Sequence, residues 1–381
     1  MSRIVLAGAF GQRNPGDDAL LESFARALAG HELVATSAAP VSGVPSVELV
    51  GTGDPTAVMR RVRAADAVVF AGGTIFKELR PATGRPPVDL LARALAMGFG
   101  TRALGKPLAL VGVGAAPLRR GRSRMLARRL VHQASLLVLR DEESADVLVD
   151  AGAPAPFRIG ADAAWPLLDR PLDPPATTRD DVVVALSHDA GDRDLADELA
   201  AMLVPVLAGG LAVALQPWQL GRVGQRDDID LARAVNARLG GTARIEVPPA
   251  DLLEARERFA QARLVVAQRF HALVAAASAG VPAIAYAHEP KLAGLARRLA
   301  QPSLTPGEDP ARLGAAILAA AHAAQPPSAA AVRAQYAAAE EGFRLLRLVL
   351  DGGRNPDADT IGSLPLRPRA WATPTREAVR L

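Results

Sequence analysis

The stretch that decides the fold is LVVAQRFHALVAAASAGVPAIAYAHEPKLAGLARR, residues 264–298. A short apolar run at its start predicts a buried strand over 264–267, and the Ala-rich segment that follows predicts a helix ending near Gly280. A second apolar run predicts another strand over 283–286. A strand, a helix and a second strand joined by short turns are typical of a parallel α/β sheet.

Three polar side chains stand where these two strands end. Arg269 and His271 follow the first strand, and Lys291 follows the second. Ligands of open α/β sheets bind outside the carboxyl ends of the strands. A single histidine in such a place is more often a satisfied structural group than a catalyst. Because the basic residues Arg269 and Lys291 stand at the same strand ends, we consider His271 a candidate catalytic residue.

Strand and helix alternate in the same way along most of the chain. Apolar strands are predicted at 3–7, 67–71, 108–111, 136–139 and 157–159 in the first half, and at 182–186, 211–216 and 244–246 in the second. Each half therefore has the pattern of a parallel sheet with short connections. We predict an α/β protein with two Rossmann-like domains whose parallel sheets face a cleft.

The length of the chain supports two domains. With 381 residues it exceeds the usual size of a single hydrophobic core. A Pro-rich segment without apolar periodicity predicts a linker over 171–180. The N-terminal domain is then 1–170, the C-terminal domain with the proposed donor site is 181–353, and a Pro/Arg-rich tail is 354–381.

Composition excludes several classes of function. The formal net charge is only +4 and aromatic residues make up 4%, which argues against a nucleic-acid partner. Cysteine is absent, so disulfides and thiolate metal sites are excluded, and no His-x-x-x-His or acidic metal-binding motif occurs. We expect no metal and no cofactor. The lack of a signal peptide or a long apolar segment favours a cytoplasmic protein.

One predicted helix, 119–134, is strongly basic. Its arginines have two interpretations: a solvated helix face, or a surface attracted to anionic lipid head groups. The first is the more common arrangement, and the second would place the protein in peripheral contact with the inner face of the membrane.

The first strand is followed by a Gly-rich loop, GAFGQRNPGDDALL, residues 8–21. The loop lacks the Gly-Lys-Ser/Thr of a P-loop and the glycine spacing of a dinucleotide fingerprint. Asp17 is a candidate N-cap of a helix predicted over 19–29, and it is equally a candidate for contact with substrate hydroxyls.

Two further strand ends carry candidate groups. Gly72, Gly73 and Thr74 form either a plain tight turn or a turn that lets backbone amides approach a ligand. Arg140 follows the strand 136–139 and precedes a helix, an arrangement suited to an anion. The acidic residues at 141–143 could instead pair with it.

These segments together resemble the polysaccharide pyruvyl transferase family. The motifs that carry the resemblance, in family order, are NPGDDALL at 14–21, GGTIF at 72–76, LRDEES at 139–144, RFHAL at 269–273, AGVP at 279–282 and Lys291. The family pattern is a Gly-Asn-x-Gly-Asp-Glu-Ala loop, a triple glycine, an Arg-Asp-x-x-Ser segment, and Arg-x-His-Ala followed by Gly-x-Pro and a lysine. The resemblance spans Arg3 to about Ala300 and implies a glycosyltransferase B type of fold.

The resemblance implies transfer of a pyruvyl group from phosphoenolpyruvate to a sugar of a cell-surface polysaccharide or its lipid-linked precursor. The product would be a ketal, and phosphate would be released. Phosphoenolpyruvate would be the donor substrate, so no cofactor is implied. A nucleotide-sugar glycosyltransferase of the same fold and a non-catalytic glycan-binding relative are the alternatives, because a shared fold does not determine function.

The active site implied by the resemblance contains residues from several of these motifs. His271 and Asp17 are the expected acid–base residues, since imidazole exchanges a proton near neutral pH. The residues expected to bind donor or sugar are Arg140, Arg269, Lys291, Asn14, Gly16, Gly72, Gly73 and Thr74.

Overall fold

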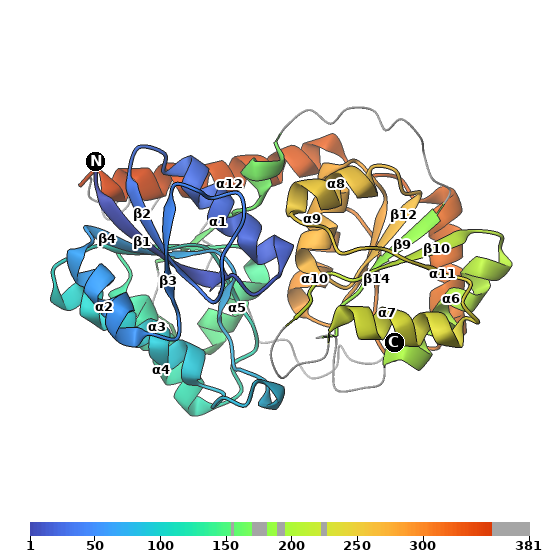
Figure 1. Cartoon of the computed structure of the whole chain (residues 1–381), viewed down its shortest axis with the longest axis horizontal. Helices are drawn as coiled ribbons and strands as arrows, with labels where there is room; N and C mark the ends of the chain where they lie inside the picture. The colour runs from blue at the N-terminus through green and yellow to red at the C-terminus, as the bar shows by residue number, and fades with distance from the viewer. Residues whose placement is uncertain (154–155, 170–180, 189–194, 222–226, 353–381) are drawn as a thin grey trace.

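The computed structural model describes residues 1–153, 156–169, 181–188, 195–221 and 227–352. Within these ranges the chain forms two α/β units, each built on a parallel sheet with helices on both faces (Figure 1). The predicted class of two Rossmann-like domains is confirmed. The predicted linker, 171–180, and the predicted tail, 354–381, lie outside the described residues.

The N-terminal sheet has the order β3-β2-β1-β4-β6-β7-β8, and β5 pairs with β6 beyond this path. Its strands are β1 (Arg3–Phe10), β2 (Glu32–Ser37), β3 (Val47–Gly51), β4 (Ala67–Ala71), β5 (Thr74–Phe76), β6 (Leu108–Ala115), β7 (Leu136–Leu139) and β8 (Arg158–Ile159). The sequence prediction omits β2 and β3. Both strands alternate or mix polar with apolar residues, so neither forms the continuous apolar run that marks a strand buried on both faces.

Helices cover this sheet. They are α1 (Pro15–Ala27), α2 (Pro55–Ala64), α3 (Asp89–Ala103), α4 (Gly121–Gln133) and α5 (Glu142–Asp150), with short 3₁₀ turns η1 (Pro81–Thr83) and η2 (Trp165–Leu168). Successive residues of β1 face opposite sides, as a pleated strand requires. Ile4 and Leu6 pack toward α1, whereas Val5 and Ala7 belong to the core on the other face, with α2, α3 and α4.

The C-terminal sheet has the order β11-β10-β9-β12-β13-β14. Its elements are β9 (Asp181–Ala185), α6 (Leu195–Ala208), β10 (Ala212–Gln216), α7 (Asp228–Arg238), β11 (Arg244–Ile245), α8 (Leu252–Phe259), β12 (Leu264–Ala267), α9 (Phe270–Ser278), β13 (Ala283–Tyr286), α10 (Pro290–Arg298), β14 (Ser303–Leu304) and α11 (Pro310–Ala323). The strands and helix predicted within residues 264–298 are confirmed. The segment lies at the centre of this sheet, because β12 pairs with β9 and β13.

The strand order reverses once in each sheet, between β1 and β4 in the first and between β9 and β12 in the second. A doubly wound sheet opens a crevice at such a point, because the connections on its two sides run to opposite faces. Residues 11–14 and 72–73 follow β1 and β4, and residues 186–188 and 268–269 follow β9 and β12. The topology therefore places three of the predicted motifs, at 14–21, 72–76 and 269–273, at switch points.

The last helix, α12 (Ala329–Leu350), returns to the N-terminal sheet and packs against β6, β7 and η2 (Figure 1). Phe343 on α12 is 1% exposed and meets Phe24 of α1 edge to face, with ring centroids 4.8 Å apart. The domain division from the sequence places 329–350 with the C-terminal domain, whereas these contacts join the helix to the first sheet. An amphipathic pattern predicts that a helix packs, but not against which sheet.

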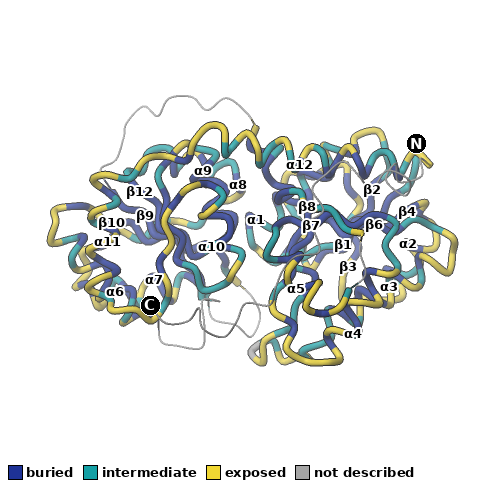
Figure 2. Tube along the Cα trace, turned by 180° about the vertical axis from the view of Figure 1, so that it is seen from behind, coloured by how far each residue is buried: buried dark blue, intermediate teal, exposed yellow. Residues whose placement is uncertain are grey.

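The apolar core is continuous between the domains. One cluster joins Ile4 and Val111 of the first sheet to Val265 and Ala285 of the second through α1, α8, α9 and α12. Figure 2 shows both sheets as buried strands and places most of the exposed chain on outer helices and turns. No helix in the described part of the chain is both long and apolar enough to span a bilayer.

Candidate active site

The carboxyl ends of the two sheets contribute residues to one interface. Trp218 Nε1, beyond the end of β10, donates a hydrogen bond to Asn14 Oδ1 at 3.1 Å. Its neighbour Gln219 donates from Nε2 to the carbonyl of Gln12 at 2.9 Å. The loop after β1 is thus held by the C-terminal domain. Trp218, which the sequence prediction does not include, lies in this interface.

Asn14, and not Asp17, caps the first helix. Asn14 Oδ1 accepts from the Gly16 N–H at 3.1 Å, and Asn14 Nδ2 donates to Asp17 Oδ2 at 2.8 Å. The prediction of Asp17 as N-cap of a helix over 19–29 is wrong, because Pro15 is compatible with the first helical position and starts α1 there. Asp17 instead lies in the first turn, where its carboxylate interacts favourably with the helix dipole.

Gly16 contacts the ring of His271 from the other domain. A Cβ atom built on Gly16 would lie 2.2 Å from His271 Nδ1 and 2.3 Å from Cγ. Only a residue without a side chain fits this approach. The absence of a side chain at Gly16 therefore allows the His271 ring to pack against the N-terminus of α1.

Asp18 has a raised proton affinity. Its carboxyl is partly buried, and burial raises the pKa of Asp18 to about 6, against the opposing effect of the Gly11 N–H, which donates to Oδ1 at 2.7 Å. The charge of Asp17 adds to the rise. Asp18 is consequently a second carboxyl in this loop, and it changes charge close to neutral pH.

The glycines at 72 and 73 have positive φ angles, 69° and 73°, which explains the residue type. The Gly72 N–H donates to the Val111 carbonyl at 2.9 Å, and the Gly73 carbonyl accepts from the Gly114 N–H at 2.7 Å. Thr74 begins β5 and pairs with Gly114. The turn is therefore joined to β6, and the Gly72 amide is engaged in that connection.

Arg140 is buried, with 3% of its surface exposed. Its Nε donates to Asp141 Oδ2 at 2.8 Å, its Nη1 lies 3.5 Å from Asp162 Oδ2, and its guanidinium stacks 4.2 Å from the ring centre of Phe270. Nη2 lies beside Gly114 and has no hydrogen-bond partner among the described residues. The sequence allowed Arg140 either to pair with neighbouring carboxylates or to bind an anion. The structure shows that it pairs with Asp141 and Asp162, while its Nη2 remains a buried donor without a partner among the described residues.

His271 lies in the first turn of α9 and is 7% exposed. Its Nε2 is 3.5 Å from Asp162 Oδ1, a long contact for a hydrogen bond. Asp162 follows β8 of the N-terminal domain and is 1% exposed. Arg140 and His271, from different domains, thus meet on opposite oxygens of one carboxylate.

The sequence prediction does not assign a role to Asp162. The feature that could have identified Asp162 is its position, because it follows the last strand of the N-terminal sheet just as the other candidate residues follow their strands. Burial alone would raise the pKa of Asp162, but His271 and Arg140, with the Ala164 N–H, hold it below its usual range. The carboxylate is therefore ionised between its two partners.

Arg269 makes its contacts within its own domain. Its Nη2 donates to both oxygens of Asp228, at 2.9 and 2.7 Å, and its Nε donates to the Leu186 carbonyl at 3.3 Å. Asp228 is 1% exposed and also accepts from the N–H groups of His188 and Gln219. This bidentate pair ties the ends of β9 and β12 together.

Lys291 pairs with Glu289. Burial alone would raise the pKa of Glu289, but Lys291 holds it far below its usual range. Glu289 also lies 3.8 Å from Arg80 of the N-terminal domain. Burial lowers the pKa of the neighbouring His288 to about 4, which leaves its imidazole neutral at pH 7. Lys291 is 22% exposed at its side chain, more than Arg140 or Arg269.

The predicted residues are brought together only in part. Asn14, Gly16, Arg140 and His271 share the interface, with Asp17 and the turn at 72–74 next to it. Each of the three predicted donor-binding cations is paired with a carboxylate. Within the described ranges, no group of three or more His, Asp or Glu side chains is arranged to hold a metal ion.

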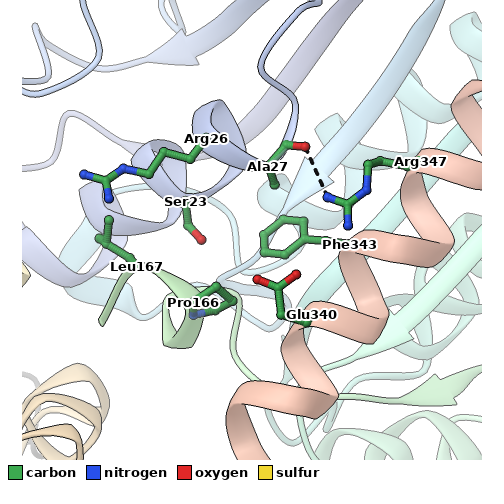
Figure 3. Close-up of a pocket in the computed structure, with 8 residues that line it drawn as sticks. All are labelled: Ser23, Arg26, Ala27, Pro166, Leu167, Glu340, Phe343 and Arg347. Carbon is green, nitrogen blue, oxygen red and sulfur yellow. Dashed lines mark hydrogen bonds between the residues drawn. The ribbon is translucent and has the colours of Figure 1, made fainter. Parts of the chain in front are cut away.

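A surface cavity lies elsewhere, between α1, η2 and α12 (Figure 3). Its volume is about 190 Å³. Ser23 and Phe343 line it, as does Arg347, whose Nη1 donates to the Ala27 carbonyl at 3.2 Å. It contains none of the predicted site residues, so the candidate site rests on the interface contacts.

Comparison with known proteins finds a family model that covers most of the chain. The family model described as polysaccharide pyruvyl transferase matches residues 14–290. The match begins at Asn14 and ends beside Lys291, so it contains the N-terminus of α1, Arg140 and His271. No curated protein sequence matches the chain.

Solved structures of low sequence identity share the fold. HepE of Anabaena, solved with UDP and glucose, is 16% identical with a TM-score of 0.63, covering 92% of this chain and 100% of its own. A putative UDP-N-acetylglucosamine 2-epimerase from Listeria monocytogenes is 12% identical with a TM-score of 0.58, covering 93% and 98%. The UDP-GlcNAc 2-epimerase of Methanocaldococcus jannaschii is 12% identical, also at 0.58, covering 92% and 100%. The predicted similarity to glycosyltransferase B folds is confirmed.

Replacing Gly16 by alanine is expected to force the domains apart. Alanine is favourable within a helix by about 0.5–1 kcal/mol, but here its Cβ would overlap the His271 ring. Small-angle X-ray scattering of Gly16→Ala should give a larger radius of gyration than the wild type. Gly121→Ala, at the start of α4 with nothing within 4 Å of its Cβ, is the matched control and should leave scattering unchanged. Identical curves for all three proteins would contradict the close approach.

The Asp18 carboxyl is expected to make stability depend on pH. Because its folded pKa of about 6 exceeds the ordinary 3.8, it favours folding at pH below about 4, and this contribution is lost as the pH rises through about 6. Asp18→Asn keeps an acceptor for Gly11 and cannot ionise. At about 1.4 kcal/mol per pKa unit, the variant should be more stable than the wild type by about 2 to 3 kcal/mol above pH 7.

Urea midpoints between pH 4 and 8 measure this difference, which should vanish near pH 4. Asp150→Asn, at an exposed position, is the control and should show no such dependence. A difference between Asp18→Asn and the wild type that is constant over this range would disprove the assignment.

Proposed function

Because the chain belongs to the polysaccharide pyruvyl transferase family, we propose that it transfers a pyruvyl group from phosphoenolpyruvate to a sugar. The acceptor is a cell-surface polysaccharide or its lipid-linked precursor. The carrying observation is that Arg140 and His271, both within family motifs, meet across the domain interface on the carboxylate of Asp162.

The reaction joins two sugar hydroxyls to the central carbon of the donor. A proton is added to the methylene carbon, which becomes a methyl group, and the bond to the phosphate oxygen breaks. The two sugar hydroxyls lose their protons. One of these protons balances the proton gained by the methylene carbon, and the other balances the proton gained by the departing phosphate. The chemistry requires an acid, a base and cations that stabilise the anionic donor. It requires no cofactor.

His271 and Asp17 are the proposed acid–base groups. They come from opposite sides of the interface, and Gly16 beside Asp17 contacts the His271 ring. Asn14 holds Asp17 by a hydrogen bond of 2.8 Å. The sugar would therefore bind beside the contact between the N-terminus of α1 and the start of α9, with Gly72, Gly73 and Thr74 on the donor's side near Arg140.

Donor binding would require its anionic groups to replace carboxylates. Lys291 is the most accessible of the three cations, so phosphate would compete there with Glu289. Arg140 offers its buried Nη2, which has no hydrogen-bond partner in the described part of the chain. Arg269 is held by both oxygens of Asp228, and its Nε and Nη1 donate to the Leu186 carbonyl and to Gln219 Oε1, so a donor anion would have to compete with these acceptors.

Replacing His271 by glutamine is expected to lower phosphate release from phosphoenolpyruvate by about 100-fold or more, since a general acid–base residue typically contributes 10²–10⁴. The assay measures phosphate in the presence of candidate glycans, with His132→Gln, on the exposed side of α4, as the matched control. Equal release by wild type and His271→Gln would disprove the role. Tight binding of a UDP sugar without any response to phosphoenolpyruvate would favour the glycosyltransferase alternative, and glycan binding without turnover would favour the non-catalytic one.

The face formed by α3 and α4 is the proposed membrane contact. Helix α4 contains no acidic residue, and Arg122, Arg128 and Arg129 on it are exposed. Phe99 on the neighbouring α3 is 49% exposed, and Leu104, directly after α3, is 44% exposed. Basic and large apolar side chains on adjacent helices suit an anionic lipid surface.

The double variant Arg128→Glu/Arg129→Glu is expected to bind anionic vesicles roughly 30-fold more weakly, from about 1 kcal/mol for each basic side chain lost. Sedimentation with phosphatidylglycerol vesicles measures this, and phosphatidylcholine vesicles serve as the neutral surface. Arg312→Glu/Arg333→Glu, which changes exposed arginines of α11 and α12 by the same charge, is the matched control. Equal binding by both double variants would exclude this face.

A further inference from the structure

Asp162 is a buried group to which the proposed reaction assigns no step. It follows β8, is 1% exposed, and is the carboxylate that both Arg140 and His271 contact. A buried carboxylate is costly unless it is paired. Its partners come from different domains, so the full set of contacts exists only while the domains are together.

The N-terminal domain holds the orientation of this carboxylate. Asp162 Oδ1 accepts from the Ala164 N–H at 3.0 Å, and Oδ2 lies 3.5 Å from Arg140 Nη1. Arg140 is held in turn by Asp141 of the same domain at 2.8 Å, and the ring of Phe270, from α9 of the C-terminal domain, lies 4.2 Å from its guanidinium. These contacts orient the Asp162 carboxylate without the help of a substrate.

The C-terminal domain supplies the imidazole. His271 Nε2 faces Asp162 Oδ1 at 3.5 Å, and Nδ1 faces the backbone of Gly16 at the N-terminus of α1. An ionised carboxylate only accepts hydrogen bonds, so the nitrogen that faces it carries a proton. In a neutral imidazole the other nitrogen is then the acceptor.

Several charged groups of the described residues lie on the two sides of the ring. On the Asp162 side are the guanidinium of Arg140 and the carboxylates of Asp141 and Asp162, and on the α1 side is the carboxylate of Asp17. The positive end of the α9 dipole acts on the ring from its own helix. His271 Nε2 makes no hydrogen bond of good geometry in the described part of the chain, and Asp162 Oδ1 at 3.5 Å is the acceptor that it faces, so this carboxylate favours a proton on Nε2.

We propose that Asp162 is a positioning residue that holds His271 as the Nε2–H tautomer and leaves Nδ1 as the nitrogen that exchanges a proton with the substrate. The catalytic use of Nδ1 rests on the proposed pyruvyl transfer, whereas the tautomer does not. Separation of the domains would remove the contact, so the Nε2–H form of His271 depends on the contact between the domains.

The direct test is nitrogen NMR of protein labelled with ¹⁵N-histidine, with the signals of His271 identified by their loss in His271→Gln. The wild type should show a protonated Nε2 and an unprotonated Nδ1 at pH values where the ring is neutral. A protonated Nδ1 in the wild type would overturn the proposal. This measurement needs no substrate and no variant of Asp162.

Asp162→Asn is the second arm. Its amide can present N–H to the ring, so the tautomer population should move toward Nδ1–H. The rate of phosphate release should fall about 100-fold or more with a changed pH profile, while KM for phosphoenolpyruvate changes little. Replacement of the equivalent aspartate by asparagine in serine protease triads shows the same effect through the wrong tautomer.

Asp141→Asn is the matched control, because Asp141 is equally buried against Arg140 and makes no contact with His271. It should leave the tautomer unchanged. An unchanged tautomer in Asp162→Asn, or the same shift in both variants, would overturn the proposal. A protein that shows the Asp162-dependent tautomer but does not consume phosphoenolpyruvate would refute the proposed function and leave this inference standing.

Discussion

The interaction on which this site depends is one carboxylate shared by two domains. Asp162 is buried and ionised, and Arg140 and His271 occupy its two oxygens. Loss of either partner would leave a buried charge poorly compensated, which is destabilising by several kcal/mol in typical proteins. The need to pair Asp162 therefore couples the end of β8 in one domain to the start of α9 in the other.

Packing supports the same arrangement. Helix α12 leaves the C-terminal domain and lies on the N-terminal sheet, and the apolar cluster around α1, α8, α9 and α12 passes from one domain to the other. Ser278 of α9 and Tyr336 of α12 are joined by a hydrogen bond of 2.9 Å. Surface ion pairs such as Glu143 with Arg297 contribute little by comparison, because they are partly exposed to solvent.

The pairing of each proposed donor-binding cation with a carboxylate has a physical consequence. The Lys291–Glu289 pair is partly exposed, so water can compensate either partner during an exchange with phosphate. Arg140 is desolvated, and separation from both its carboxylates would be far more costly. An anionic donor would therefore exchange partners at Lys291, whereas at Arg140 it would take up the remaining Nη2 donor without displacing Asp162.

The sequence by itself determined the elements and the strand ends that carry polar groups. Apolar runs such as 264–267 and 283–286 predict buried strands, because a strand covered on both faces must be apolar throughout. They also place Arg140, Arg269, His271 and Lys291 at carboxyl ends. Local sequence did not determine where the first helix begins. Asn14 and Asp17 are both suitable N-cap residues, and the Asn14–Pro15 pair starts the helix earlier than predicted.

Only the tertiary structure decided which of these groups meet. Contacts between residues distant in the chain, such as Asp162 with His271 and Gly16 with the same ring, depend on how two separately folded sheets face each other, and no local periodicity encodes that orientation. For the same reason the packing of α12 on the first sheet could not be read from its amphipathic pattern. The histidine was visible in the sequence, but the carboxylate that orients it became apparent only when the two sheet edges were brought together.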